Sequence, residues 1–423
     1  MTRLHFRVLV VGAGPAGLAA AAAAAEAGAD VGLADANPGP GGQVWRAAHS
    51  GPGVHWARRV RDLGVRLLTG TRVVAVLGPT AVLGETDAGP LELRSERLIL
   101  TPGARERFLP FPGWTLPGVT GAGGLQALAK GGLSVAGDRV VVAGTGPLLL
   151  AAAAYLRNCG ARVGCVVEQA GTPRLAGFLP ALLRDGARLR QAATLAWDLR
   201  GVPWRTACHV VAAHGRERIE AVTLRRGGAE WTARCDRLAC GFGLVPNLEL
   251  PLSVGCAVAD GVVRVDAWQR TSISGVYCAG EATGVAGLEA ALAEGSIAGL
   301  AATGRSDLAR TYFPARERGR RFGAALERAF ALRAELRELP DASTTVCRCE
   351  DVPYAELRAH GNWREAKLQT RCGMGPCQGR VCGTALAFLF GWTPDSVRPP
   401  VTAASVGALA VVADGDGGAP APG

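Results

Sequence analysis

A glycine-rich run near the N-terminus, Gly12-Ala-Gly14-Pro-Ala-Gly17, is the feature that most constrains the fold of this 423-residue chain. The run follows a strand-like segment at residues 6–11 and precedes a predicted helix at residues 18–27. In such a unit the first glycine permits a tight turn, the second lets a pyrophosphate approach the backbone, and the third lets the helix pack on the strand. The free N–H groups of the helix N-terminus favour the phosphates. We therefore predict a bound dinucleotide, contacted by Gly12, Gly14, Pro15, Ala16 and Gly17.

An acidic residue follows where the ribose of that dinucleotide is expected. Asp35 comes 23 positions after Gly12, at the end of a second predicted strand at residues 30–34. A carboxylate at this place can accept hydrogen bonds from the ribose hydroxyl groups. We assign Asp35 and the adjacent Ala36 to the adenosine end of the ligand.

Two further segments favour FAD over NAD at this first site. The segment Gly275-Val-Tyr-Cys-Ala-Gly280-Glu281 precedes a helix that begins near Leu288, and in flavoproteins with two dinucleotide domains a similar strand ends in an aspartate that contacts the ribityl chain. The acid here is Glu281, one methylene longer. Leu100-Thr101-Pro102-Gly103-Ala104 matches another strand end of those flavoproteins, with Pro102 in an unusual place. We expect FAD contacts from Thr101, Gly103, Gly280 and Glu281.

The segment Gly41-Gly42-Gln43-Val-Trp45 follows the adenosine-binding strand and is expected to line the flavin through Gly42 and Gln43. It contains no cysteine pair, so redox chemistry of the thioredoxin-reductase type is not supported. No Ser–His–Asp or Cys–His arrangement stands out, and the catalytic residues remain unassigned.

A second strand–glycine–helix unit begins about 130 residues after the first. It comprises a strand at 139–142, Gly144-Thr-Gly146, a helix at 147–159 and a strand at 162–167. Leu149 takes the place of the third glycine, and Glu168 stands where an acid would bind a ribose, which disfavours a 2′-phosphate. NAD, ATP or a relic fold without a ligand remain open for Gly144, Gly146 and Glu168.

Five of the twelve cysteines gather near the C-terminus, at positions 347, 349, 372, 377 and 382. Thiols clustered in a chain without a secretory signal indicate metal ligands rather than disulfides. The Cys-x-Cys start with a distant Cys-x4-Cys differs from common zinc spacings, and nearby glycines can donate N–H groups to cluster sulfurs. We predict a [2Fe–2S] cluster with zinc as the rival metal, and leave Cys372 as a spectator or alternative ligand. The chosen ligands are Cys347, Cys349, Cys377 and Cys382.

Composition excludes several other classes of protein. The formal net charge is +10, but the basic residues are almost all arginines scattered along the chain, which argues against nucleic-acid binding. No apolar stretch reaches the roughly 20 residues of a membrane helix. The start of the chain is unlike a signal peptide, so we expect a cytoplasmic protein.

These patterns predict an α/β chain with two doubly wound dinucleotide-binding domains and a small, mainly helical [2Fe–2S] domain. The glycine-rich stretch at 118–124 is interpreted as a hinge, residues 316–339 as a charged helix, and the last fifteen or so residues as a disordered tail. The second domain interrupts the first. The expected boundaries are 1–118 with 243–312 for FAD, 119–242 for the insert, 313–343 for a helical linker, 344–392 for the cysteine domain and 393–423 for the C-terminal segment.

Several longer motifs resemble one family of flavoproteins. They are Gly41-Gly-Gln43, the run from Gly103 to Gly118, Gly121-Ala-Gly-Gly-Leu-Gln126, the run from Ala239 to Asn247, and the cysteine module. The chain resembles the FAD-containing alpha (A) subunits of heteromeric amino-acid and opine dehydrogenases, which include opine oxidase, hydrogen cyanide synthase and D-hydroxyproline or proline dehydrogenases. Residues 344–390 resemble the [2Fe–2S] domain of bacterioferritin-associated ferredoxin.

The resemblance implies a division of labour. A glycine-oxidase-like flavoprotein beta subunit would oxidise the amine, and this chain would pass the electrons to a quinone or another carrier. Some relatives include a small ferredoxin-like subunit, an FMN at an interface between subunits, or ATP in the second nucleotide domain. Partners could hold such a complex at the inner face of the membrane. The enzymatic alternative is a self-sufficient NAD(P)H-dependent flavin reductase, and the non-enzymatic alternative is a scaffold subunit.

Overall fold

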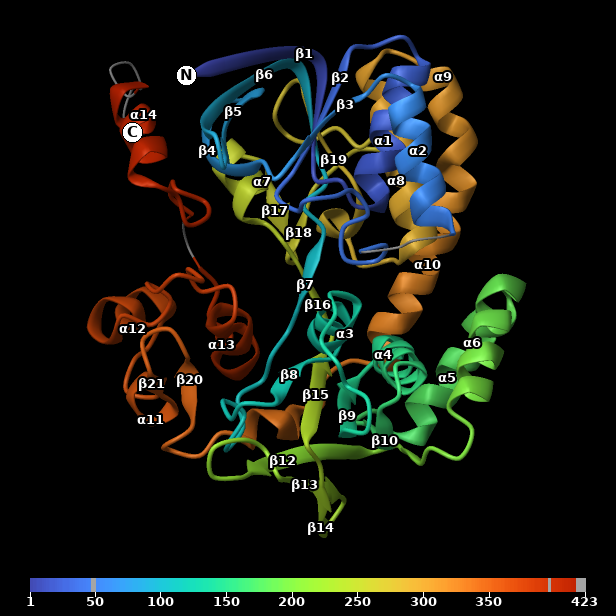
Figure 1. Ribbon diagram of the computed structural model, residues 1–423, viewed down its shortest axis with the longest axis vertical. Coiled ribbons are helices and arrows are strands. Elements are labelled where there is room, and N and C mark those ends of the chain that lie inside the picture. The colour runs from blue at the N-terminus through green and yellow to red at the C-terminus, as the bar shows by residue number, and fades with distance from the viewer. Residues whose placement is uncertain (47–50, 395–396, 416–423) are drawn as a thin grey trace. The chain divides into compact units, whose positions relative to one another are not determined.

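The computed structural model describes residues 1–46, 51–394 and 397–415, which fall into two compact units. The first unit contains Met1–Arg105, Pro246–Gly323 and the described part of the C-terminal segment. The second contains Glu106–Val245 and residues 324–394. Figure 1 draws the chain from its N-terminus in blue to its C-terminus in red.

The first unit is built on a sheet in which β-strands follow the order β3-β2-β1-β6-β5-β4, with β19 also paired to β6. β1, β2, β3, β6 and β19 are parallel, whereas β4 and β5 form an antiparallel extension. Their bounds are β1 Thr2–Val11, β2 Val31–Asp35, β3 Arg66–Thr69, β4 Arg72–Gly78, β5 Ala81–Thr86, β6 Gly89–Leu100 and β19 Val276–Cys278. The parallel strands extend from β1 in both directions, to β2 and β3 on one side and to β6 and β19 on the other. This is the doubly wound arrangement, in which ligands bind at the carboxyl ends of the strands.

Helix α1 (Pro15–Glu26) packs on α8 (Leu288–Ala302) because both helices present small residues. A Cβ atom added at Gly295 would lie 2.1 Å from the carbonyl oxygen of Ala16, and one added at Gly299 would lie 2.3 Å from that of Ala20. Larger side chains there would force the helices apart. Figure 1 shows α1 beside α8, and their close approach fixes the start of α1 and the glycine turn that precedes it.

Short elements complete the first unit. They are α2 Pro52–Asp62, α7 Glu249–Val254, β17 Val258–Ala259, β18 Val262–Val263, α9 Ser306–Ala309, α14 Val406–Gly415, and the 3-10 turns η1 Gly280–Thr283 and η2 Arg310–Tyr312. The chain passes from one unit to the other within three elements, which are strand β7 (Ala104–Glu106), strand β16 (Leu244–Pro246) and helix α10 (Phe313–Ala329).

The second unit repeats the doubly wound plan with a parallel sheet in the order β11-β10-β9-β15-β8. A three-stranded antiparallel sheet, β12-β13-β14, accompanies it. The strands are β8 Val119–Gly121, β9 Arg139–Thr145, β10 Arg162–Glu168, β11 Trp204–Arg205, β12 Cys208–His214, β13 Ala221–Arg226, β14 Ala229–Arg234 and β15 Arg237–Phe242. The helices are α3 Ala122–Lys130, α4 Pro147–Asn158, α5 Thr172–Leu183 and α6 Gly186–Asp198.

The cysteine-rich segment forms a small, mainly helical module with its own core. Its elements are β20 Thr345–Cys347, β21 Val352–Pro353, α11 Tyr354–Leu357, α12 Trp363–Thr370 and α13 Cys382–Phe390. The 3-10 turn η3 (Ala334–Glu338) precedes the module, and its Leu336 packs in the core of the second unit. Trp363 is buried at the centre, so closely that a Cβ added at Gly373 would lie 2.8 Å from its ring. The core therefore holds the cysteine-bearing loops against one another.

The predicted α/β class, with two dinucleotide-type sheets and a helical cysteine region, is confirmed. Three local predictions differ from the structure. The expected hinge at 118–124 is instead strand β8 and the start of α3, because Val119–Gly121 pairs with β15. Residues 409–415, expected to be disordered, belong to helix α14, while residues 416–423 lie outside the described part of the chain. The proposed domain boundaries remain a prediction.

The third difference concerns the charged helix expected at 316–339. Helix α10 ends at Ala329, and η3 begins only at Ala334. The carbonyl groups between them face other partners: that of Phe330 accepts from Thr145 Oγ1 at 3.2 Å, and that of Ala331 accepts from Gln169 Nε2 at 3.1 Å. These long-range hydrogen bonds satisfy backbone groups that a continuous helix would have used.

Candidate functional site

The first glycine turn has the geometry that its spacing predicts. Gly12 has a φ of +107°, and a Cβ added there would lie 2.2 Å from the carbonyl oxygen of Thr101. A Cβ at Gly17 would lie 1.7 Å from the carbonyl oxygen of Gly12. At Gly14, by contrast, no heavy atom of the described residues comes within 4 Å of an added Cβ. Two glycines are therefore needed for packing, and the third leaves the backbone open to a ligand.

Asp35 ends β2 beside this turn, and its carboxylate is held in place by backbone and side-chain donors. Oδ2 accepts from the N–H of Ala13 at 2.5 Å, and Oδ1 accepts from both the N–H and the Nδ2 of Asn37 at 2.7 Å. Arg46 in turn donates to the Asn37 side chain at 2.8 Å. Ala36, also predicted at this site, is exposed. The arrangement orients the carboxylate toward the turn, and Asn37 is a contact that the spacing argument missed.

The loop at Gly41–Gln43 lies directly against the glycine turn. The N–H of Gly41 donates to the carbonyl of Ala13 at 2.8 Å, and a Cβ added at Gly42 would lie 2.8 Å from Cα of Gly14. Gln43 is exposed. This loop therefore lies close enough to the turn to share a ligand with it.

Thr101 ties the end of β6 to the same turn. Its Oγ1 donates to the carbonyl groups of Val11 and Gly12, at 3.0 and 2.8 Å. Gly103 follows with a φ of +68°, and its carbonyl accepts from the N–H of Asn247. The Nδ2 of Asn247 also donates to the carbonyl of Pro102 at 2.8 Å. Asn247 thus supports the strand end despite the unusual proline.

A buried glutamate supports the segment at Gly280 and Glu281. Glu294, on α8 and 2% exposed, accepts from the N–H of Gly280 at 2.9 Å and from Thr283 Oγ1 at 2.8 Å. Arg320 forms an ion pair with it at 2.8 Å. Glu281 itself is half-buried on η1, and burial raises the pKa of its carboxyl group. Glu294 was not identified from the sequence.

We predict that Glu294→Gln weakens both stability and FAD binding. The substitution leaves the partly exposed Arg320 without its counter-ion and removes a charged acceptor from the Gly280 N–H, which should cost about 1–3 kcal/mol. Urea unfolding and FAD titration of the apoprotein measure the two effects. Glu327→Gln, at an exposed residue of helix α10, is the control. Unchanged unfolding and FAD affinity in Glu294→Gln would contradict the supporting role.

The second glycine turn accommodates Leu149 through a further glycine. A Cβ added at Gly144 would lie 1.9 Å from the carbonyl oxygen of Gly241 on the neighbouring strand β15. A Cβ added at Gly241 would lie 3.3 Å from Cδ2 of Leu149, which is fully buried. The absence of a side chain at Gly241 therefore gives Leu149 its space. Gly146, with a φ of +99°, has no heavy atom of the described residues within 4 Å of an added Cβ.

Glu168 ends β10 next to this second turn. It accepts from the N–H of Gly146 at 2.7 Å, from Thr145 Oγ1 at 2.8 Å and from the N–H of Ala170 at 2.8 Å. Burial raises the pKa of its carboxyl group, although these donors oppose the shift. Glu106, missed by the sequence analysis, similarly accepts from the N–H groups of Gly123 and Gly124 at the start of α3. The second unit keeps the geometry of a nucleotide turn, and its acid, like Asp35 in the first unit, accepts three hydrogen bonds from neighbouring groups.

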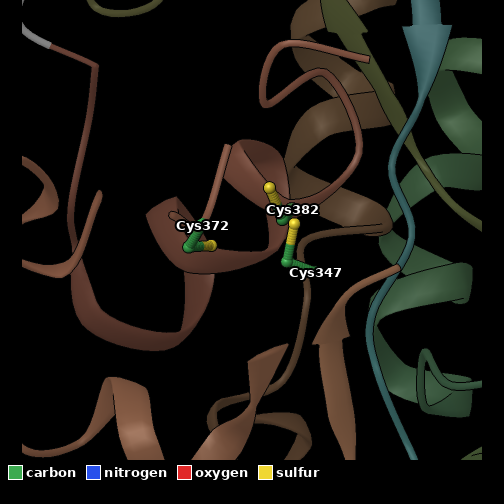
Figure 2. A group of neighbouring side chains, drawn as sticks. All are labelled: Cys347, Cys372 and Cys382. Atoms are coloured by element: carbon green, nitrogen blue, oxygen red, sulfur yellow. The ribbon is translucent and has the colours of Figure 1, made fainter. Parts of the chain in front are cut away.

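The four predicted cluster ligands line one cavity of about 310 Å³ in the cysteine module. Cys347, Cys349, Cys377 and Cys382 form its wall together with Arg348 and Val381. Cys372 does not line this cavity, but its sulfur lies within 4.8 Å of those of Cys347 and Cys382. Figure 2 shows the Cys372 sulfur pointing toward the other two. Cys347, Cys372 and Cys382 are buried and Cys349 is exposed, so the centre has one edge at the surface.

Backbone N–H groups point at these sulfurs, as expected for metal-bound thiolates. Hydrogen bonds from the Cys372 and Cys382 side chains, with N–H donors of Gly373 and Glu350, lower the pKa of Cys347 to about 2. Cys382 and the N–H groups of Val381 and Gly379 lower the pKa of Cys377 to about 5. Cys382 is the proton donor in these contacts, and its own pKa is raised. The donor set fits a cluster of iron and sulfide, and a cluster would displace the shared protons.

The chain belongs to the pyridine nucleotide-disulphide oxidoreductase family, whose model matches residues 6–298. It is an FAD-dependent oxidoreductase of that family. Among the described residues, no helix has the length and apolar character needed to cross a membrane.

Two relatives match most of the chain. The opine oxidase A subunit of Rhizobium meliloti (strain 1021) is 32% identical, over 95% of this chain and 98% of the relative. The HcnB subunit of hydrogen cyanide synthase from Pseudomonas protegens is 33% identical, over 88% of this chain and 89% of the relative. The fold is similar to that of L-proline dehydrogenase from P. horikoshii, with a TM-score of 0.68 and 19% identity, covering 96% of this chain and 80% of that structure. The predicted family resemblance is confirmed.

Proposed function

We propose that this chain is the electron-transfer subunit of a heteromeric amine, amino-acid or opine dehydrogenase. It would hold FAD in the first unit and a [2Fe–2S] cluster in the cysteine module, and pass electrons from a flavoprotein partner to a quinone or another carrier. The observation that carries the proposal is a cavity lined by four cysteines in a chain that also has a complete flavin-type turn. The names of the relatives, which are subunits of oxidases and synthases, support a partner.

In this proposal Gly12, Gly14, Gly17 and Asp35 bind the adenosine and pyrophosphate of FAD, and Glu281 lies near the ribityl chain. FAD supplies two-electron chemistry and the cluster supplies one-electron transfer, so together they can connect a two-electron donor to a one-electron acceptor. The protein contributes binding, orientation and N–H donors to the sulfurs. A glycine-oxidase-like partner would contribute the base that deprotonates the amine.

The four ligands proposed for the cluster are Cys347, Cys349, Cys377 and Cys382. Their shared cavity supports this set, and the position of Cys372 beside two of them supports its role as a substitute ligand. Zinc is the competing metal, because four thiolates can also hold it tetrahedrally.

The alternative function is a self-sufficient NAD(P)H-dependent reductase, which would need a working nucleotide site in the second unit. Leu149 occupies the place of the third glycine in the turn of that unit, which disfavours this alternative. ATP at Gly144 and Gly146 and FMN at an interface between subunits remain further proposals from the family resemblance.

We predict that NADH leaves the purified chain oxidised. The visible absorption of flavin and cluster should stay unchanged on anaerobic addition of NADH, and dithionite should then bleach both, since it needs no binding site. Dithionite serves as the control for accessible cofactors. Bleaching of both bands by NADH at a rate that supports turnover would establish the reductase alternative instead.

A further inference from the structure

We propose that Arg348, held over Trp114, raises the reduction potential of the cluster in the cysteine cavity; this inference rests on the proposed function. Arg348 lies between two of the proposed ligands, Cys347 and Cys349, and lines the same cavity. It is the one cationic residue among the residues lining that cavity in the described structure. Its position relative to the sulfurs is therefore set by the ligand-bearing loop itself.

An aromatic ring from a distant part of the sequence holds this guanidinium. The Cζ of Arg348 lies 5.3 Å from the centroid of the Trp114 ring, which is within the range of a cation–π contact. The Nε1 of Trp114 also donates to the carbonyl of Thr345 at 2.6 Å. One indole thus binds strand β20 through its N–H and the following arginine through its face.

Trp114 is itself fixed. It is 2% exposed, and its ring contacts Phe108 at a centroid distance of 5.9 Å. The preceding Gly113 fits so tightly that an added Cβ would lie 2.0 Å from the carbonyl oxygen of Ala213. The adjacent Pro112 carbonyl accepts from the Ala213 N–H at 2.8 Å. A ring anchored on strand β12 in this way can hold an otherwise exposed arginine at the cavity.

The electrostatic consequence follows from the charge of the group that the thiolates would bind. A cluster with four thiolate ligands is anionic and gains one more negative charge on reduction. A nearby cation stabilises the reduced form more than the oxidised form, so it raises the potential. Because Arg348 is exposed at the rim, the effect should be partly screened by salt.

The test is a redox titration of the full chain carrying Arg348→Gln, monitored by the electron paramagnetic resonance signal of the reduced cluster. We expect a shift of the midpoint to lower potential that diminishes as KCl is raised, with iron content and flavin midpoint unchanged. Arg348→Lys should recover part of the shift. Arg358→Gln is the matched control: Arg358 is also exposed and stacks on an aromatic ring, Tyr354, but does not line the cavity.

The outcomes separate this inference from the proposed function. Iron retained with an unchanged midpoint in Arg348→Gln would overturn the inference alone, as would an equal shift in Arg358→Gln. Loss of iron from Arg348→Gln would also overturn it, because the residue would then act in cluster retention. A wild-type chain without iron would overturn the proposed function together with this inference.

Discussion

Cys377→Ser is expected to abolish the visible absorption of the iron–sulfur cluster while FAD stays bound. Cys377 lines the cavity, and the N–H groups of Val381 and Gly379 stabilise its thiolate. A serine at this place offers a much harder and more basic ligand, so iron should be lost or bound weakly. The proposed FAD site at Gly12–Gly17 belongs to the other unit, so the flavin absorption should remain. Iron analysis and visible spectra of the purified variant measure the result.

Two further serine variants identify which four cysteines act. Cys349→Ser should resemble Cys377→Ser, because Cys349 lines the same cavity, whereas Cys372→Ser should change the spectrum little. Cys372 is buried beside Cys347 and Cys382, so it is the cysteine positioned to replace a ligand that has been removed. Cys159→Ser, at the end of helix α4, is the control for a cysteine outside the module. Iron lost from Cys372→Ser but kept in Cys349→Ser would show that the ligand set is wrong.

Gly17→Val is expected to prevent FAD binding and to destabilise the first unit. A Cβ at Gly17 would lie 1.7 Å from the carbonyl oxygen of Gly12, which belongs to the backbone and cannot move without opening the turn. Overpacking of this kind typically costs about 1–3 kcal/mol and more where the backbone must shift. The purified variant should lack flavin, and its urea midpoint should fall.

Gly14→Ala separates binding from stability at the same turn. Its backbone has a φ of −73°, which alanine adopts without strain, and no described atom lies within 4 Å of the added methyl. The apoprotein should therefore unfold at the wild-type urea concentration, while FAD affinity falls because the methyl occupies the approach of the pyrophosphate. Wild-type FAD affinity in Gly14→Ala would contradict the placement of the pyrophosphate at this turn.

The sequence predicted the fold well because glycine is required wherever the backbone leaves no room for a Cβ atom, so the spacing of glycines indicates the geometry of the turn. Gly12 and Gly17 each face a carbonyl oxygen at a distance that excludes a Cβ, so their identity follows from the turn. The Leu149 substitution was harder to interpret, because the compensating Gly241 comes 92 positions later and becomes its neighbour only when β15 pairs with β9.

The supporting acids could not be found by spacing. Glu294 is one of several glutamates in helical sequence, and its burial depends on the packing of α8 against α1. Glu106 is the last residue of strand β7 and accepts hydrogen bonds from the first N–H groups of α3, a contact with no local signature. Helix α10 ended early for a similar reason, since the carbonyl groups of Phe330 and Ala331 accept long-range hydrogen bonds. Local patterns predict elements, whereas such contacts depend on tertiary pairing.

The most direct test of the account is the cofactor content of the purified, anaerobically prepared chain. We predict about one FAD, about two irons and about two acid-labile sulfides per chain, with an electron paramagnetic resonance signal of a reduced [2Fe–2S] cluster after dithionite. FAD together with about one zinc and no labile sulfide would show that the cysteine centre is structural, and would contradict the electron-transfer role.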